Sequence, residues 1–195
     1  MINQIKNVLT KEECDTLIDY CKPRLEKSKV VNSFSSKGKS RSHKDRTSSG
    51  CILYDDNQEI QKIIEKIKHL IEEHTQLPSE NQEYPYQVLN YQIGEEYKHH
   101  WDQFRTDNKY WNYAKKTGGQ RKFSILIYLN NVEEGGETDY PYLDLKVKPE
   151  IGKMVIHTNM VGDECIEESY HGALPVIKGE KWVLVNWVRL NKYTG

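Results

Sequence analysis

Apolar positions in the first 80 residues recur at the spacing of amphipathic helices. One set begins after Thr10 and Glu13, which form the capping-box pattern of a helix start. Its apolar members lie three and four residues apart, as one helix face requires: Cys14, Leu17, Ile18 and Cys21. Pro23 predicts the end of this helix, because proline lacks the backbone N–H that a helix interior uses.

A longer stripe of branched aliphatic residues predicts a second helix. It consists of Ile60, Ile63, Ile64, Ile67, Leu70 and Ile71. Asp56 or Asn57 can cap its start, and Pro78 lies beyond its end. We expect both helices to be scaffold elements that pack an apolar face on a sheet.

Beyond Pro85 the period changes from that of helices to that of strands. Four segments are predicted strands: 86–94, 123–129, 153–157 and 181–189. Each either alternates between two faces or is rich in branched and aromatic residues. In the second of these, Ser124, Leu126 and Tyr128 share one face, and the odd-numbered residues share the other. Helices followed by strands with short turns predict an α+β, mainly β chain, built as a β-sandwich or barrel with N-terminal helices packed outside.

Size and charge narrow the possibilities. A chain of 195 residues suits a single domain, 1–195, with 1–80 as mainly helical support carrying a substrate loop and 84–195 as the barrel core. Lys and Arg total 28 against 29 Asp and Glu, so a net charge of -1 offers no electrostatic case for binding nucleic acid or an anionic membrane.

The same sequence predicts a cytoplasmic protein. No apolar run approaches the roughly 18–20 residues of a membrane span, and residues 1–15 lack the features of a secretory signal. The four cysteines show no CxxC spacing, so we expect free thiols in a reducing compartment.

Residues 32–50, between the predicted helices, form a polar segment rich in serine and glycine. Its basic and titratable residues are Lys37, Lys39, Arg41, His43, Lys44 and Arg46. Composition leaves two interpretations open, a solvated loop or a lid that closes over a ligand.

A candidate metal site begins with His100 and Asp102. They follow a predicted strand, in which residues i and i+2 point the same way, so one imidazole and one carboxylate can reach a common point. His171, ten residues before Lys181, is well placed to add a third ligand. Two histidines and one carboxylate leave open positions on Fe(II) for a chelating cosubstrate and oxygen. Alone, however, an HxD pair is a weak signal.

Five motifs in order resemble the prolyl 4-hydroxylase branch of the 2-oxoglutarate/Fe(II) dioxygenases. They are RTSSG (46–50), YQIGEEYKHHWD (91–102), RKFSILIYLN (121–130), EEGGETDYP (133–141) and HGALPVIKGEKW (171–182). Each is moderately specific, and the ordered set is strongly specific. The resemblance runs nearly end to end and implies a double-stranded β-helix, the cupin-like jelly roll.

The resemblance also implies roles for individual residues. His100, Asp102 and His171 match the iron ligands, and Lys181 matches the lysine that pairs with the far carboxylate of 2-oxoglutarate. The residues expected to line the cosubstrate pocket are Tyr91, Ser124 and Tyr128. Those expected near the peptide groove are Arg46, Tyr97, Trp187 and Arg189. The physical argument for Lys181 is independent: a buried cation at a strand end is costly unless an anion meets it.

Other polar residues near these motifs are expected to have ordinary roles. His99 and His157 are expected to be structural or exposed, and the acidic stretch from Glu133 to Asp139 is expected to form a turn because of its glycines.

The expected function is Fe(II)/2-oxoglutarate-dependent hydroxylation of prolyl residues in a peptide or protein, with O2 as cosubstrate and ascorbate as a supporting cofactor. Residues 32–50 are expected to close over the bound peptide. Three alternatives stay open: a related oxygenase acting on lysine or a small molecule, a nucleic-acid demethylase, and a silent jelly-roll binding module. Lys181 and the net charge argue against the demethylase, and the complete set of four residues argues against the silent module. The oligomeric state is left open.

Overall fold

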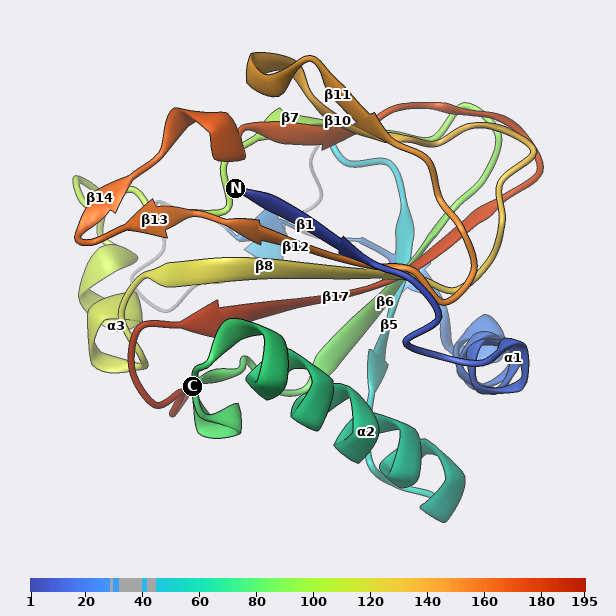
Figure 1. Cartoon of the computed structure of the whole chain (residues 1–195), viewed down its shortest axis with the longest axis horizontal. Helices are drawn as coiled ribbons and strands as arrows, with labels where there is room; N and C mark the ends of the chain where they lie inside the picture. Colours follow the sequence, from blue (N-terminus) through green and yellow to red (C-terminus); the bar gives the residue numbers. More distant parts are fainter. Residues whose placement is uncertain (29, 32–39, 42–44) are drawn as a thin grey trace.

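The largest element of the computed structural model is a seven-stranded antiparallel sheet (Figure 1). Its strands, in spatial order, are β1 (Ile2–Ile5), β12 (Met154–Thr158), β8 (Arg121–Tyr128), β17 (Lys181–Arg189), β6 (Tyr86–Tyr91), β5 (Ser49–Leu53) and β2 (Glu26–Lys27). A second sheet, above it in Figure 1, consists of β11 (Leu145–Val147), β10 (Thr138–Tyr140), β15 (His171–Ala173) and β7 (Tyr97–His100). The remaining pairs are β13 (Met160–Val161) with β14 (Glu164–Cys165), β16 (Val176–Lys178) with β9 (Glu134–Gly135), and β3 (Val30–Val31) with β4 (Ser40–Arg41).

The structure describes residues 1–28, 30–31, 40–41 and 45–195. Most of the 32–50 segment, and with it the predicted closure over a peptide, lies outside the described residues.

Both predicted helices are present with the expected ends. The helices are α1 (Lys11–Cys21), α2 (Gln58–Thr75) and α3 (Trp111–Lys116), with 3-10 turns η1 (Lys22–Arg24), η2 (Ser79–Asn81), η3 (Pro141–Leu143) and η4 (Glu167–Ser169). The capping box of Thr10 and Glu13 forms as predicted, and Asn57 caps α2 by accepting a hydrogen bond from the backbone N–H of Ile60 at 2.8 Å. Pro23 follows α1 in η1.

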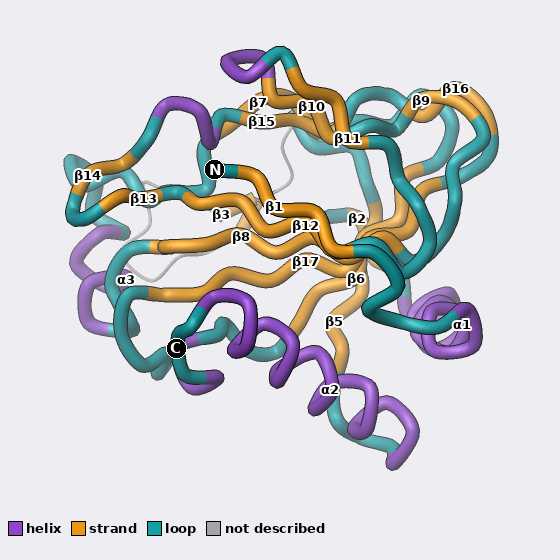
Figure 2. The backbone as a smooth tube through the Cα atoms, in the orientation of Figure 1, coloured by secondary structure: helices purple, strands orange, loops and turns teal. Residues whose placement is uncertain are grey.

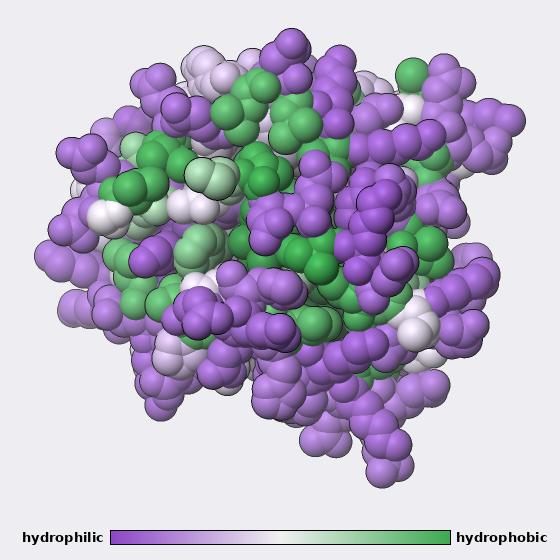
Figure 3. All heavy atoms as spheres, in the orientation of Figure 1, coloured by the Kyte–Doolittle hydropathy of each residue, from purple (hydrophilic) through white to green (hydrophobic). Residues whose placement is uncertain are grey.

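The main sheet separates two apolar layers. The helices α1 and α2 cover one face, where Ile125, Ile127, Trp182 and Leu184 join the buried isoleucines of α2 in one cluster. The other face meets the second sheet in a smaller cluster that includes Tyr128 and Val183. On the face of the molecule seen in Figure 3, hydrophilic residues predominate and apolar ones show in smaller patches between them.

This architecture confirms the mainly β jelly-roll prediction with helices outside. Two details differ. In the described part of the chain the strands form separate facing sheets rather than one closed barrel wall (Figure 2). The first 80 residues also supply β1, β2 and β5 to the main sheet. These strands are short, and β1 pairs with β12 about 150 residues away, so local patterning gave no sign of them.

No helix among the described residues combines the length and apolar character needed to cross a lipid bilayer.

We expect replacement of Ile64 by alanine to destabilise the fold by about 2–5 kcal/mol, because this residue of α2 is completely buried between helix and sheet. Urea unfolding of the variant measures the effect. Lys62→Ala, an exposed change on the same helix, serves as the control and should alter the free energy of unfolding by no more than about 0.5 kcal/mol. Equal effects would mean that α2 does not contribute through its buried face.

Candidate active site

A cavity of 350 Å³ lies between the two sheets and gathers most of the predicted site residues. Its walls include Arg46, Tyr91, Tyr97, His100, Asp102, Ser124, His171, Lys181 and Trp187. Tyr128 and Arg189 are not among its lining residues. The volume lies at the lower end of typical small-ligand sites, which are about 300–1,000 Å³.

Three candidate metal ligands converge at one side of this cavity. One ligand atom from each of His100, Asp102 and His171 lies within 4.8 Å of the other two. His171 is paired with His100 across β15 and β7, which brings residues 71 positions apart together. The Nε2 atom of His100 lies 3.5 Å from Oδ1 of Asp102, and Nε2 of His171 lies 3.7 Å from Oδ2.

Backbone carbonyls determine which imidazole nitrogens face Asp102. Nδ1 of His100 donates to the carbonyl of Lys98 at 2.8 Å, and Nδ1 of His171 donates to the carbonyl of Ser169 at 2.8 Å. A carbonyl only accepts, so each Nδ1 carries a proton, and Nε2 is the ring nitrogen that faces the carboxylate and is placed to bind a metal ion. This is the tautomer that metal-binding histidines use, with the other ring nitrogen anchored by a backbone group.

The charge states suit a divalent cation. Burial, with His157 and His100 nearby, holds the pKa of His171 well below its ordinary value, so the ring is neutral. Burial opposes ionisation of Asp102, but the neighbouring imidazoles of His100 and His157 outweigh it and hold the carboxyl pKa well below its ordinary value. Two imidazoles and one carboxylate form a donor set that fits Fe(II).

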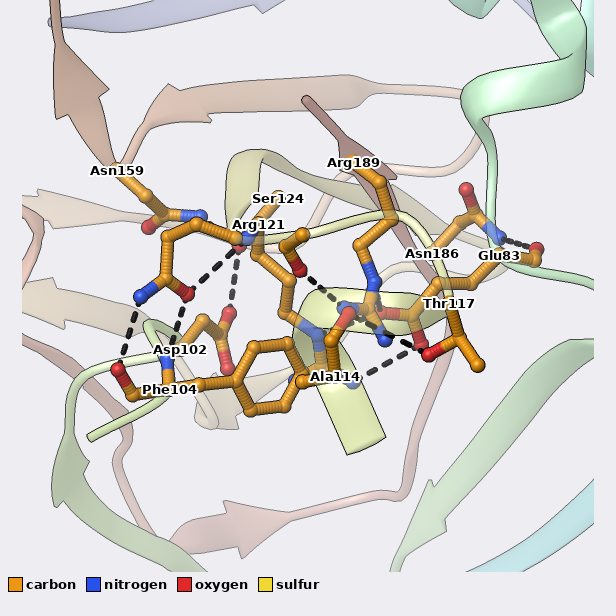
Figure 4. Close-up of polar contacts among 12 residues, drawn as sticks. Glu83, Asp102, Phe104, Ala114, Thr117, Arg121, Ser124, Asn159, Asn186 and Arg189 are labelled. Atoms are coloured by element: carbon orange, nitrogen blue, oxygen red, sulfur yellow. Dashed lines mark hydrogen bonds and ion pairs between the residues drawn. The ribbon is translucent and has the colours of Figure 1, made fainter. Parts of the chain in front are cut away.

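Ser124 contacts Asp102 directly. Its hydroxyl donates to Oδ2 of Asp102 at 2.6 Å, and the side-chain amide of Asn159 donates to the Ser124 hydroxyl at 2.9 Å (Figure 4). Ser124 belongs to β8 of the main sheet, whereas Asp102 follows β7 of the second sheet. This hydrogen bond therefore orients the carboxylate from across the cavity, a role that the sequence did not predict.

Lys181 is a buried cation with little to neutralise it. Its side chain is 2% exposed, and Nζ donates to the carbonyl of Gly136 at 2.7 Å. Nζ also lies 5.4 Å from the ring centre of Tyr91 and 5.5 Å from that of Tyr128. Burial lowers the pKa of Lys181 to about 7, against the opposing effect of the Glu137 carboxylate. An anion entering the cavity would restore the charge of this lysine.

Tyr128 lies behind the cavity wall rather than in it. Its hydroxyl is hydrogen-bonded to Oγ1 of Thr138 at 2.7 Å, and Thr138 is the residue that lines the cavity. The predicted contact of Tyr128 with a cosubstrate stays a prediction, and Thr138 becomes a second candidate.

Arg121 lines the cavity and Arg189 does not, although the two pair across β8 and β17. The register shift between Val188 and Arg189 leaves Lys122 of β8 without a partner on β17, and the Arg189 guanidinium lies 4.5 Å from the ring centre of Phe104. The Arg189 guanidinium is buried, and it donates to Oε1 of Glu83 at 2.6 Å. This position does not favour the predicted contact with a peptide.

Glu83 joins both arginines into one buried cluster (Figure 4). Arg121 donates to it through Nε at 2.7 Å and Nη2 at 3.0 Å. Burial opposes ionisation of Glu83, but the two guanidinium groups outweigh it and hold its pKa below the ordinary value. The Arg121 guanidinium lies 3.6 Å from the ring centre of Trp187, so Glu83 holds a flat cationic and aromatic surface at the cavity.

Two histidines outside the triad have defined partners. His99 is hydrogen-bonded to Asp139 at 2.7 Å. His157 is completely buried, its Nδ1 is 2.9 Å from the Tyr140 hydroxyl, and its Nε2 is 3.7 Å from Oδ2 of Asp102. Its position next to the metal site follows from the pairing of His157 with Ser124 between β12 and β8, which only the assembled sheet reveals.

Comparison with known proteins identifies the family. Residues 86–189 match the model of the 2OG-Fe(II) oxygenase superfamily. The chain belongs to that superfamily. It is 38% identical to "Probable prolyl 4-hydroxylase 10" and 35% identical to "Prolyl 4-hydroxylase 5", both from Arabidopsis thaliana. Each alignment covers 96% of this chain, with 68% and 67% of the respective relatives.

A solved structure shares the fold as well. The viral collagen prolyl hydroxylase from Paramecium Bursaria Chlorella virus-1, crystallised as a 2OG complex, aligns with a TM-score of 0.71 at 27% identity, covering 96% of this chain and 95% of that chain. The present chain is a 2-oxoglutarate-dependent dioxygenase with Fe(II) and 2-oxoglutarate as cofactors. O2 and ascorbate are typical of the family to which the chain belongs.

Ser124→Ala should weaken Fe(II) binding roughly 10- to 100-fold, because loss of the hydroxyl frees one oxygen of Asp102 from its orienting hydrogen bond. Competition against a metal-binding dye measures the affinity without relying on turnover. Ser124→Thr, which keeps the hydroxyl, should bind Fe(II) nearly as well as the unmodified protein. Unchanged affinity in the alanine variant would show that Asp102 does not need this bond.

The KM for 2-oxoglutarate should rise about fivefold from pH 7 to pH 8, because the charged form of Lys181 becomes scarcer above a pKa of about 7. The groups facing its ammonium are Glu137, Tyr91 and Tyr128; burial raises the pKa of both tyrosines, so they stay neutral in this range. Lys181→Ala should raise the KM at pH 7 sharply and flatten its pH dependence. A variant that retains the fivefold rise would exclude Lys181 as the titrating group.

Proposed function

We propose that the chain is a peptidyl-proline 4-hydroxylase in which His100, Asp102 and His171 hold Fe(II) and Lys181 binds the distal carboxylate of 2-oxoglutarate. The observation that carries this proposal is the convergence of all four groups on one 350 Å³ cavity. The prolyl 4-hydroxylases among its relatives support proline as the residue that is modified.

The protein's own contribution is orientation and charge. Lys98 and Ser169 carbonyls hold both imidazoles with Nε2 toward the metal position, and Ser124 holds the carboxylate. When bound, the cofactors would supply the oxidation, in which the substrate C–H group, 2-oxoglutarate and O2 are converted to the hydroxylated residue, succinate and CO2. The side chains around the cavity keep water away and fix the substrate carbon beside the metal position.

The substrate wall of the cavity suits proline. Tyr97 stacks on His100 at 3.8 Å between ring centres, and Arg46 lies 5.1 Å from the Tyr97 ring centre. The Arg121 guanidinium stacks on the ring of Trp187, so the wall offers flat surfaces and guanidinium donors. A prolyl residue has a compact apolar ring and a backbone carbonyl that only accepts, which complements such a wall.

The charge of the cavity disfavours a lysyl substrate. Arg46, Arg105, Arg121 and Lys181 all line it, against the carboxylate of Asp102, so an entering ammonium group would meet an excess of cationic side chains. A small-molecule substrate is the remaining alternative, and it predicts turnover without a peptide.

A cytoplasmic location is part of the same proposal. All four cysteines are free, with Cys14, Cys21 and Cys51 buried, as is usual for proteins of reducing compartments.

The proposal is tested by incubating the protein with Fe(II), 2-oxoglutarate, ascorbate and a proline-rich peptide, followed by tandem mass spectrometry. We expect a mass gain of one oxygen atom on proline and one succinate per hydroxylation. A peptide with alanine in place of every proline and the Asp102→Ala variant are the controls, and neither should give product. Oxygen added to lysine, or succinate formed in proportion to a small molecule alone, would contradict the proposal.

A further inference from the structure

His157 is a buried imidazole that lies beside the candidate metal ligands without being one of them. It belongs to β12, is completely buried and is not among the residues that line the cavity. Its ring centre lies 4.4 Å from that of His171, and its Nε2 lies 3.7 Å from Oδ2 of Asp102. This Nε2 has no hydrogen-bond partner among the described residues. A buried polar atom without a partner is costly, so its position beside the carboxylate calls for an explanation.

The hydroxyl of Tyr140 distinguishes this imidazole from the two ligand imidazoles. Nδ1 of His157 lies 2.9 Å from that hydroxyl, whereas Nδ1 of His100 and Nδ1 of His171 each meet a backbone carbonyl. A carbonyl can only accept, but a hydroxyl can donate. Tyr140 is completely buried, and burial raises its pKa well above the ordinary value, so the phenol keeps its proton. Tyr140 can therefore donate to Nδ1 and leave the ring hydrogen of His157 on Nε2, where it faces Asp102.

The acceptor positions of Asp102 show what this hydrogen can do. The two oxygens of a carboxylate offer about four lone-pair positions. The Ser124 hydroxyl takes one of them on Oδ2, at 2.6 Å (Figure 4), and Nε2 of His157 faces the same oxygen. Its distance of 3.7 Å is about 0.5–1 Å longer than an ordinary N–H···O bond, a gap that a small shift of the carboxylate would close.

The other carboxylate oxygen faces the ligand imidazoles. Oδ1 of Asp102 lies 3.5 Å from Nε2 of His100. Nε2 of His171 lies 3.7 Å from Oδ2, but this nitrogen is the one placed to bind the metal, so it does not compete as a donor. With Oδ2 engaged by two donors, Oδ1 is the oxygen left for a metal ion.

We propose that His157, with its ring hydrogen directed by Tyr140, is a positioning residue that joins Ser124 in holding Oδ2 of Asp102, so that Oδ1 binds the metal. This inference rests on the metal ligands of the proposed function and is independent of the substrate. One carboxylate oxygen and two imidazole nitrogens would occupy half of an octahedral ion. The other half would stay open for 2-oxoglutarate and O2.

The double variant His157→Leu/Tyr140→Phe tests the inference by removing the donor and its partner together. No buried polar atom is stranded, so the urea midpoint of unfolding should stay close to that of the unmodified protein. Affinity for Fe(II), measured by competition against a metal-binding dye, should fall roughly 10- to 100-fold, the usual effect of losing a contact that orients a metal ligand. A lower midpoint with unchanged affinity would mean that the two residues only support the fold, and would overturn the inference.

Rescue and spectroscopy separate positioning from packing. His157→Gln keeps a side-chain N–H that can reach Oδ2, so it should recover most of the Fe(II) affinity. The visible absorption of Co(II), bound in place of Fe(II), depends on the arrangement of its ligands. We expect this spectrum to change in the double variant and to return in His157→Gln. The same spectrum in all three proteins would contradict a positioning role.

Tyr140→Phe keeps the inference testable if the double variant does not fold, because it removes a single oxygen atom. Without the hydroxyl the ring hydrogen of His157 is no longer directed to Nε2, so Fe(II) affinity should fall by about two- to tenfold, the value of one hydrogen bond. Tyr86→Phe is the matched control. Tyr86 is also buried and its hydroxyl is hydrogen-bonded to Gln82, but it lies on the opposite face of the main sheet, so affinity should not change. Equal affinities in the two variants would overturn the role of Tyr140.

Asp102→Ala separates failure of this inference from failure of the proposed function. Removing the carboxylate should abolish specific Fe(II) binding if Asp102 is a ligand. Loss of binding in Asp102→Ala with full affinity in the His157 and Tyr140 variants would overturn the inference alone. Full affinity in Asp102→Ala would refute the ligand set on which the proposed function depends.

Discussion

Asp102 has to stay ionised in a buried position, and the active site is arranged around that requirement. Its carboxylate lies between Nε2 atoms of His100 and His171 and accepts a hydrogen bond from Ser124. The imidazoles come from the second sheet and the serine from the main sheet, so the site forms only when the two sheets face each other. Loss of that packing would leave the three candidate ligands on the second sheet without the orienting hydroxyl of Ser124.

Two other buried charged residues, Glu83 and Lys181, differ in whether the protein itself supplies their counter-ions. Glu83 is matched by Arg121 and Arg189 within the protein, so its cluster is complete without a ligand. Lys181 has the Gly136 carbonyl and the more distant Glu137 carboxylate, and burial depresses its pKa. A buried ion whose counter-ions lie within the protein needs no ligand, whereas an incompletely paired one is poised to bind an ion of opposite charge.

Strand alternation lets the same strands serve the core and the site. In β17, Trp182 and Leu184 pack toward the helices, whereas Lys181 and Trp187 line the cavity. The helices α1 and α2 therefore support the sheet from the side opposite the chemistry, and the substrate-facing residues are free to differ without loss of the core.

Sequence patterns alone determined the features that depend on near neighbours. The capping box, the stripe of α2, the alternation in β8 and the shared direction of His100 and Asp102 follow from periods of two or about 3.6 residues. The ordered motifs added His171 and Lys181. Tertiary structure decided which distant residues meet: Ser124 with Asp102, His157 beside the same carboxylate, and Glu83 with both arginines. It also decided that Arg121 lines the cavity whereas Arg189 is buried against Glu83 and Phe104, because the register of β8 against β17 and these contacts join residues that are distant in sequence.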